Sequence, residues 1–276
     1  MRTGRIWSRW VETFLCAVVV VFAPGLALAQ ASGESPPDAK AILLGMAEFL
    51  GKAQRMSVTV RGAYDATQAS GQKIEWNEIR TVTLSRPDRL RMEAEKSNGA
   101  RSLVIFDGKE IFTYDESGKV YGQAPQPGGV DEALMYFVSD LGIRLPLAVL
   151  FFSRAATQMK NRVRSVAYVE KTGIFGAPAH HIAGRTDTVD FQVWITDGDR
   201  PVPQRVVLAY RTAPGHPEFT AQFGEWNLTA EPADSLFTFT PPADASRIPF
   251  ATAMPLLAVG SKVGPAKSAV KKGATQ

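Results

Sequence analysis

The chain has 276 residues, 45% of them hydrophobic and 21% charged, with three histidines and one cysteine. Its formal net charge of +4 is concentrated at the two ends. Three arginines and one glutamate give residues 1–29 a charge of +2, and four lysines give residues 251–276 a charge of +4, which leaves −2 for the region between. This distribution excludes a large basic surface of the kind that binds nucleic acid.

The N-terminal segment has the order of features that a secretory signal peptide requires. Three arginines precede an apolar run from Phe14 to Leu28, and Ala27-Leu28-Ala29 provides a small-x-small cleavage site. We expect residues 1–29 to be removed before Gln30 and the chain to be exported. The alternative, a retained membrane anchor, is disfavoured because the run is shorter than the roughly 20 residues that span a bilayer. Cleavage also removes Cys16, so the mature chain can form neither a disulfide nor a thiolate metal site.

A helix and a series of strands are expected after a linker over residues 30–37. Asp38 can cap the helix, in which Ile42, Met46, Phe49, Leu50 and Ala53 recur at helical spacing. From Met56 onward apolar and polar residues alternate, which predicts strands with one buried face. The strands are expected over residues 56–64, 74–85, 89–95, 103–106 and 111–114, with a tight hairpin turn at Asp107-Gly108.

Residues 123–160 break the sheet pattern and predict a helical insertion. Apolar residues recur at helical spacing over residues 131–141, and Gly142 can stop that helix. A second segment, residues 147–152, is apolar on every side. It must therefore be buried or cover an apolar surface.

Strand patterns resume after the insertion, over residues 163–171, 179–186, 189–196, 204–211 and 218–228. About eleven strands with short polar turns predict a mainly β domain with helices (α+β) over residues 38–250, built on a strongly curved antiparallel sheet. Residues 251–276 lack a periodic apolar face, and we expect them to be a disordered basic tail.

The sequence provides little that could perform catalysis, and we expect neither an enzyme nor a cofactor. His180 and His181 are adjacent in a predicted strand, so their side chains point to opposite faces and cannot bind one metal ion together. Asp187 and Asp190 lie nearby in the sequence, but a polar strand end explains them as well. A metal-dependent hydrolase that uses His181 or Asp190 is a remote alternative.

The apolar elements are more numerous than one sheet face requires. The first helix and both segments of the insertion need an apolar surface, and the concave face of the sheet is the one available. They either fill that face completely or line a cavity. The sequence pattern alone leaves both arrangements open.

Four motifs, in matching order, resemble the periplasmic lipoprotein carrier fold that is shared by the LolA carrier, the sensor domain of RseB and the mycobacterial lipid-binding lipoproteins. They are the helix-to-strand segment from Leu50 to Val60, the turn and strand Arg86-Pro87-Asp88-Arg89-Leu90-Arg91, the hairpin from Leu103 to Tyr114, and the closing segment Phe237-Thr238-Phe239-Thr240-Pro241-Pro242. Within this superfamily the chain looks most like the DUF2092 group of predicted periplasmic proteins. Trp194-Ile195-Thr196 before Asp197-Gly198-Asp199 fits the strand and turn of that group.

The resemblance implies an incomplete barrel of about eleven strands around a helix, with residues 123–160 as a helical lid. It implies a periplasmic monomer that carries lipid or lipoprotein acyl chains in an apolar cavity and exchanges them with a receptor in the inner or outer membrane. An RseB-like sensor or interaction module is the alternative.

The resemblance also implies roles for individual residues. Arg86 matches the carrier arginine that holds the lid closed through hydrogen bonds; an exposed cation at a strand end is the alternative. Leu90 departs from the carrier, which has a bulky aromatic residue there. The expected cavity lining is Met92, Phe106, Phe137, Leu141, Phe151, Phe152, Val193 and Trp226.

Overall fold

The computed structural model describes residues 37–141, 145–224, 226–229 and 231–253. The chain divides into two units, Met1–Ser35 and Pro36–Gln276, and all described residues belong to the second. The predicted signal peptide, most of the linker, Gly142 and residues 254–276 of the predicted tail lie outside the described residues.

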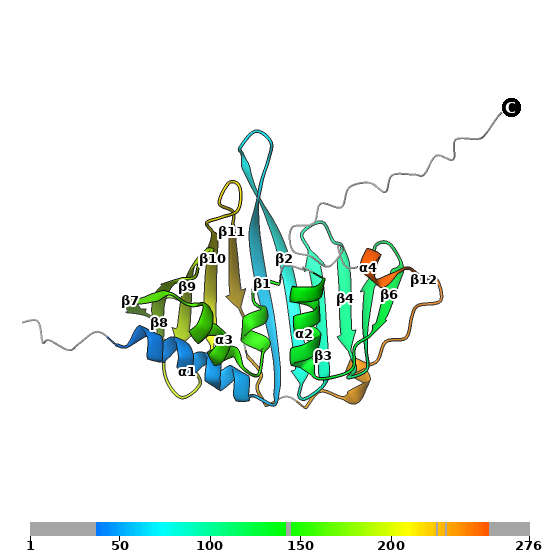
Figure 1. The fold of residues 1–276 in the computed structure, drawn as a ribbon, viewed down its shortest axis with the longest axis horizontal. Coiled ribbons are helices and arrows are strands. Elements are labelled where there is room, and N and C mark those ends of the chain that lie inside the picture. The colour runs from blue at the N-terminus through cyan, green and yellow to red at the C-terminus, as the bar shows by residue number, and fades with distance from the viewer. Residues whose placement is uncertain (1–36, 142–144, 225, 230, 254–276) are drawn as a thin grey trace, which may run out of the picture. The chain divides into compact units, whose positions relative to one another are not determined.

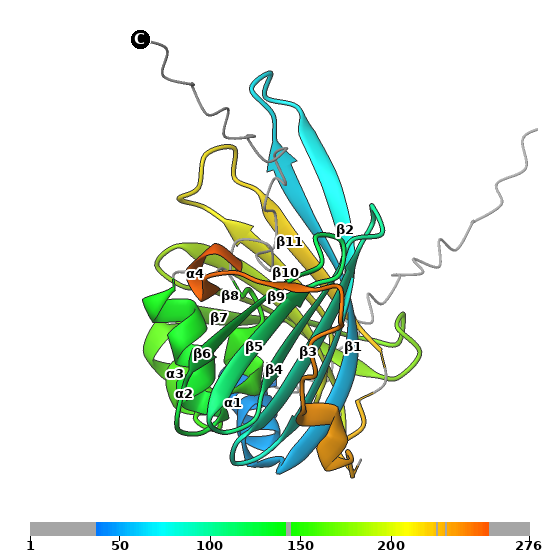
Figure 2. The ribbon, with the colours of Figure 1, turned by 90° about the vertical axis from the view of Figure 1, so that its right-hand side faces the viewer.

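Twelve strands form one curved sheet, which confirms the predicted fold class (Figures 1 and 2). The order is β12-β6-β5-β4-β3-β2-β1-β11-β10-β9-β8-β7, and all neighbours pair antiparallel except β12, which is parallel to β6. Within the described ranges the edge strands β7 and β12 do not pair with each other, so the barrel is incomplete. The strands are β1 (Arg55–Thr67), β2 (Lys73–Ser85), β3 (Arg89–Lys96), β4 (Arg101–Phe106), β5 (Glu110–Asp115), β6 (Val120–Pro125), β7 (Ser165–Thr172), β8 (Ala179–Arg185), β9 (Val189–Thr196), β10 (Pro203–Tyr210), β11 (Glu218–Phe223) and β12 (Ser246–Arg247).

Strands β6 and β12 differ from the sequence expectation. The sequence of β6 contains Gly122 and Pro125, which interrupt the usual strand pattern. Packing favours glycine at position 122, because a Cβ there would lie 3.1 Å from the Cα of Phe250 and 3.0 Å from the Cβ of Ala253. Both contacts come from α4 (Phe250–Ala253), so the first residues of the predicted tail form a short helix against β6.

The helices α1, α2 and α3 cover the concave face of the sheet (Figures 1 and 2). Asp38 caps α1 (Ala39–Lys52) by accepting hydrogen bonds from the backbone N–H groups of Lys40 and Ala41, as predicted. The insertion contains α2 (Val130–Met135), the π-helix η1 (Tyr136–Asp140), the 3-10 helix η2 (Ala148–Phe151) and α3 (Ala155–Arg162). The sequence pattern does not predict α3, because its residues are mainly polar.

The convex face is covered in part by the segment around the 3-10 helix η3 (Asp234–Phe237). The Phe237 side chain is fully buried, and the Phe239 ring lies 5.6 to 5.9 Å from the rings of Phe112, Tyr114 and Tyr121. The closing aromatic motif thus packs the C-terminal segment onto the outside of β5 and β6. None of the described helices is both long and apolar enough to cross a lipid bilayer.

Candidate functional site

A cavity of about 700 Å³ lies between the concave face of β9 and β10 and the helical elements that cover it. Most of its lining is apolar. Leu43 and Met46 of α1 and Met159 of α3 contribute from the helices, and residues 145–150 contribute from the insertion. This half of the concave face is therefore covered but not filled.

The sheet side of the cavity follows from the register of β9 and β10. Val193 pairs with Val206, Phe191 with Leu208 and Val189 with Tyr210, and all six line the cavity. Because side chains alternate between the faces of a strand, this register places three apolar pairs on the concave face. A Cβ at the neighbouring Gly184 of β8 would lie 2.2 Å from the Phe191 ring, so the glycine lets that ring lie across β8.

One end of the cavity is polar and charged. Gln158, Asn161, Arg162, Arg164, Thr186, Asp187 and Thr188 line it there. Arg164 forms a bidentate ion pair with Asp187, with N···O distances of 2.8 and 2.7 Å. The hydrogen bonds from Arg164 hold the pKa of the Asp187 carboxyl below its usual value, so this carboxylate stays charged at neutral pH.

A second ion-pair group lies beside this end. Asp190 accepts two hydrogen bonds from Arg185, at 2.6 and 2.8 Å, and its Oδ1 also lies 2.9 Å from the Nε of Arg211. The Arg185 hydrogen bonds lower the pKa of the Asp190 carboxyl. Arg211 also donates to the backbone oxygens of Thr186 and Asp187, which fixes the turn after β8.

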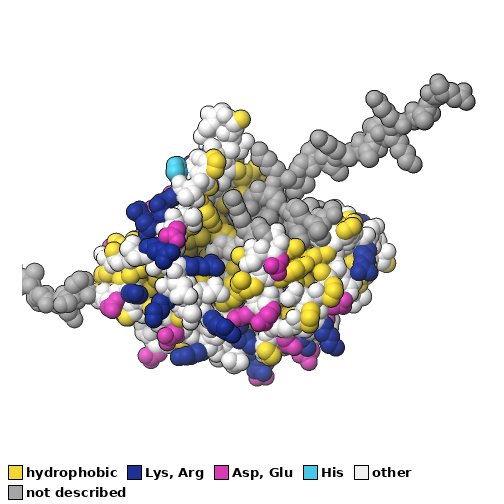
Figure 3. Space-filling model, in the orientation of Figure 1, with side chains coloured by type: hydrophobic (Ala, Val, Ile, Leu, Met, Phe, Trp, Pro, Cys, Tyr) yellow, Lys and Arg dark blue, Asp and Glu magenta, His cyan; other side chains and the backbone are white. Residues whose placement is uncertain are grey.

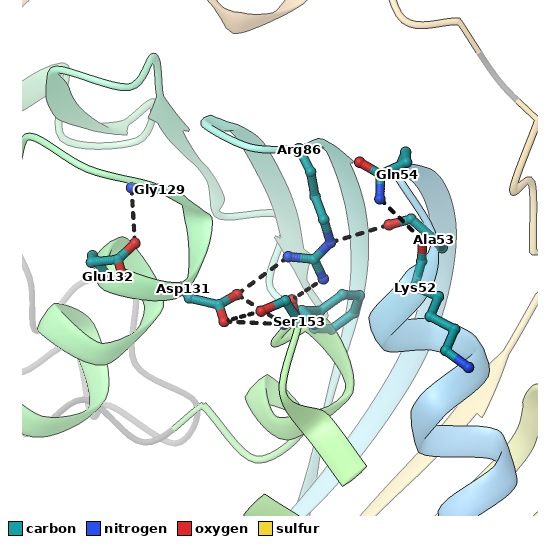
Figure 4. A network of polar contacts seen from close by, with 9 residues as sticks. Lys52, Ala53, Gln54, Arg86, Gly129, Asp131, Glu132 and Ser153 are labelled. Carbon is teal, nitrogen blue, oxygen red and sulfur yellow. Dashed lines mark hydrogen bonds and ion pairs between the residues drawn. The ribbon is translucent and has the colours of Figure 1, made fainter. Parts of the chain in front are cut away.

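Arg86 connects the elements that surround the cavity and the neighbouring core (Figure 4). Its guanidinium donates to the backbone oxygen of Ala53 at the end of α1, to the carboxylate of Asp131 in α2, and to the backbone oxygen of Phe151 in η2. Asp131 in turn accepts hydrogen bonds from the backbone N–H and the hydroxyl of Ser153. Burial lowers the pKa of the Arg86 guanidinium from its usual value, and Asp131 opposes this shift. The network joins three covering segments to one strand end.

The eight expected lining residues lie in three different environments. Phe152 and Val193 line the 700 Å³ cavity. Met92, Phe137 and Phe151 border two much smaller voids of about 40 and 20 Å³. Phe106 is fully buried, Leu141 packs against the core, and the Trp226 ring stacks on Phe223 with its indole N–H donating to the backbone oxygen of Pro203.

His180 and His181 form structural contacts with their neighbours. His180 lies between the Tyr168 hydroxyl and the Asp197 carboxylate, whereas the His181 ring stacks on Trp194 with a centroid distance of 4.0 Å. The two rings thus have separate surroundings, as their adjacency predicts. In the ranges that the structure describes, no three His, Cys, Asp or Glu side chains are grouped as they would be to hold a metal ion.

Several lining residues were absent from the sequence expectation, namely Leu43, Met46, Met159, Phe191 and Leu208. The alternating pattern of β9 contains a signal for Phe191, since it places that residue on the same face as Val193. The position of Leu43 and Met46 in the lining depends on how α1 crosses the sheet, where it contacts β7, β8 and β9. The sequence pattern of the helix alone does not give this crossing.

Comparison with known proteins gives low-identity structural matches and one family match. The lipoprotein LppX of Mycobacterium tuberculosis is 15% identical, with 71% of this chain and 99% of LppX covered and a TM-score of 0.43. MucB of Pseudomonas aeruginosa, in its complex with MucA, is 18% identical, with 76% of this chain but 63% of that chain covered and a TM-score of 0.39. A LolA superfamily protein of Nitrosomonas europaea is 11% identical, with 75% of this chain and 99% of that chain covered and a TM-score of 0.35.

Among curated protein sequences no match was found. The family described as predicted periplasmic protein (DUF2092) matches residues 39–251. That range includes α1, the sheet and the insertion that covers it. The chain therefore belongs to the DUF2092 family of predicted periplasmic proteins.

Proposed function

We propose that this protein is a periplasmic, non-enzymatic carrier or binding protein that holds an acyl chain of a lipid or of an acylated protein. The observation that carries this proposal is the 700 Å³ cavity, whose lining from α1, β9 and β10 is almost entirely apolar. Its volume lies within the usual range of small-molecule sites, roughly 300 to 1,000 Å³. The periplasmic description of the family supports the location.

The free energy of binding would come from removing the acyl chain from water. Burial of each methylene group contributes about 0.8 kcal/mol, so ten buried methylenes contribute roughly 8 kcal/mol before the cost of association. No reactive side chain is required for this function.

Arg86 is the proposed latch of the covering segment. It holds the backbone of Phe151, and the adjacent residues Leu150 and Phe152 line the cavity. Movement of this segment, with breakage of the Arg86 hydrogen bonds, would then widen the cavity during entry and release of the ligand.

Lipid extraction followed by mass spectrometry tests the proposal on protein purified from a bacterial periplasm. We expect acyl lipids to co-purify at close to one molecule per protein. Leu208 and Val207 are adjacent on β10 with opposite faces, and only Leu208 lines the cavity. Leu208→Trp should therefore reduce the lipid content by more than half, whereas the matched variant Val207→Trp should retain it.

A protein that is reproducibly free of lipid, and that also binds no added lipid after purification, would overturn the proposal. Equal lipid content in the Leu208→Trp and Val207→Trp variants would place the ligand outside this cavity.

A further inference from the structure

The polar end of the cavity opens to solvent. Asn161, Arg162 and Arg164 line the cavity and are also exposed, as are Asp187 and Thr188 of the turn after β8. The deep lining residues Met46, Val193 and Val206 are buried. An amphiphile in this cavity would thus place its chain against the sheet and its head group at the end of α3.

The charge at this opening is net positive. Four arginines (Arg162, Arg164, Arg185 and Arg211) and two aspartates (Asp187 and Asp190) lie at or beside it, which gives a local charge of +2. Figure 3 shows Lys and Arg side chains gathered over the β7 to β10 half of this face, next to exposed hydrophobic side chains. Both aspartates are engaged by Arg164, Arg185 and Arg211. Within the described part of the chain, no carboxylate pairs with Arg162.

The volume is sufficient for at least one long acyl chain. A water-sized group occupies roughly 30 Å³ of liquid, so 700 Å³ accommodates about 23 groups of that size. This corresponds to one long acyl chain with part of its head group.

We propose that the cavity binds an anionic amphiphile with one long acyl chain and that Arg162 binds its negatively charged oxygen atoms at the opening. This inference rests on the proposed function and names the class of its ligand. A fatty acid carboxylate and a lysophospholipid phosphate share this chemistry, since guanidinium groups form charge-assisted hydrogen bonds with both.

Calorimetric titration of delipidated protein tests the inference with three probes that share one chain: palmitate, palmitoyl-lysophosphatidylglycerol and the neutral monopalmitoylglycerol, each below its micelle-forming concentration. Arg162→Gln should weaken binding of the tighter anionic probe about five- to tenfold and leave monopalmitoylglycerol unchanged. Lys160→Gln is the matched control, because Lys160 is exposed on the same helix but does not line the cavity. It should change no affinity more than about twofold. The tighter anionic probe identifies the head group.

The outcomes separate this inference from the proposed function. Equal binding of all three probes, with no effect of Arg162→Gln, would overturn the head-group assignment and leave the acyl-chain site in place. The assignment would also be overturned if Arg162→Gln weakened binding of the neutral probe as much as binding of the anionic probes, because Arg162 would then act on the shape of the cavity. Failure of all three probes to bind would overturn both proposals.

Discussion

The two halves of the concave face are built from the same kind of strand but packed differently. Over β2 to β5, Leu84, Leu90, Phe106 and Ile111 are fully buried, and the voids that border this half measure about 40 and 20 Å³. Over β9 and β10, equally apolar strands face a cavity of about 700 Å³. An alternating apolar pattern therefore specifies a buried face but does not specify what fills it.

The difference arises from the covering elements. Leu134 of α2 and Phe137 of η1 are fully buried against the voids of the first half, so their side chains fill the space above β2 to β4. In Figure 1, α2 lies in front of β2 and β3, whereas α1 and α3 lie over β7 to β10. Above β9 and β10 the covering side chains come from α1, α3 and residues 145–150, and they leave the cavity between themselves and the sheet.

A buried ion pair lies on β2, the strand of the filled half that is nearest to β9 and β10 in the sheet order. Glu78 and Arg80 of β2 are 3.0 Å apart, with side chains 4% and 16% exposed, and both border the 40 Å³ void. Charged side chains here would disfavour an acyl chain, because they are costly to leave beside an apolar ligand. The void beside this ion pair measures about 40 Å³, whereas the apolar cavity of about 700 Å³ lies in the β9 and β10 half.

The largest expected effect comes from removing a core side chain of the filled half. Phe106→Ala should lower the free energy of unfolding by about 3 to 5 kcal/mol, since it creates a new void in close-packed surroundings. The matched variant Leu208→Ala should cost about 1 kcal/mol or less, because that side chain already borders a cavity. Urea unfolding of both variants measures the difference, and equal losses would contradict the contrast between the halves.

A smaller loss of stability is expected when the Arg86 network is broken. Arg86→Gln removes the charge that satisfies Asp131 and the backbone oxygens of Ala53 and Phe151. The free energy of unfolding should fall by about 2 to 3 kcal/mol, less than for a fully buried pair because Asp131 is 23% exposed.

Hydrogen exchange distinguishes a local role of Arg86 from a general one. Amide exchange should accelerate over residues 148–153, while Lys52→Gln, at an 80% exposed side chain, should leave it unchanged. Uniform acceleration across the whole sheet would indicate that Arg86 stabilises the fold without acting on the covering segment.

The smallest expected effect is the contribution of the Arg185–Asp190 pair to the pH dependence of stability. The hydrogen bonds from Arg185 lower the folded-state pKa of Asp190 below its unfolded value, so the pair stabilises the fold above the unfolded pKa, about 3.9. That contribution is lost as the pH falls through the folded pKa, and it is modest because the pair is exposed. In Asp190→Asn, Tm should fall less than in the wild type between about pH 5 and 2.

High salt provides the control for this titration, since screening should reduce the difference between the two pH profiles. Identical profiles for the wild type and Asp190→Asn at low salt would contradict a contribution of the pair.

Local sequence signals determined most of the secondary structure. The Asp38 cap, the turn at Asp107-Gly108 and the period-two patterns predicted α1 and ten of the twelve strands, because each signal depends on neighbouring residues alone. The missing strands β6 and β12 depend on distant partners: β6 contains a glycine that α4 packs against, and β12 has two residues held by β6. The polar helix α3 gave no periodic apolar signal.

The sequence by itself determined that this chain forms a curved antiparallel sheet with an apolar concave face and a covering insertion. Only the tertiary structure decided which half of that face is filled by side chains. Phe191 and Leu208 line the cavity, whereas Phe106 is fully buried in the close-packed core. Periodicity records the face on which a side chain lies. The volume left beside that side chain depends on the angle at which separate helices cross the sheet and on their distance from it. No local sequence pattern encodes this angle or this distance.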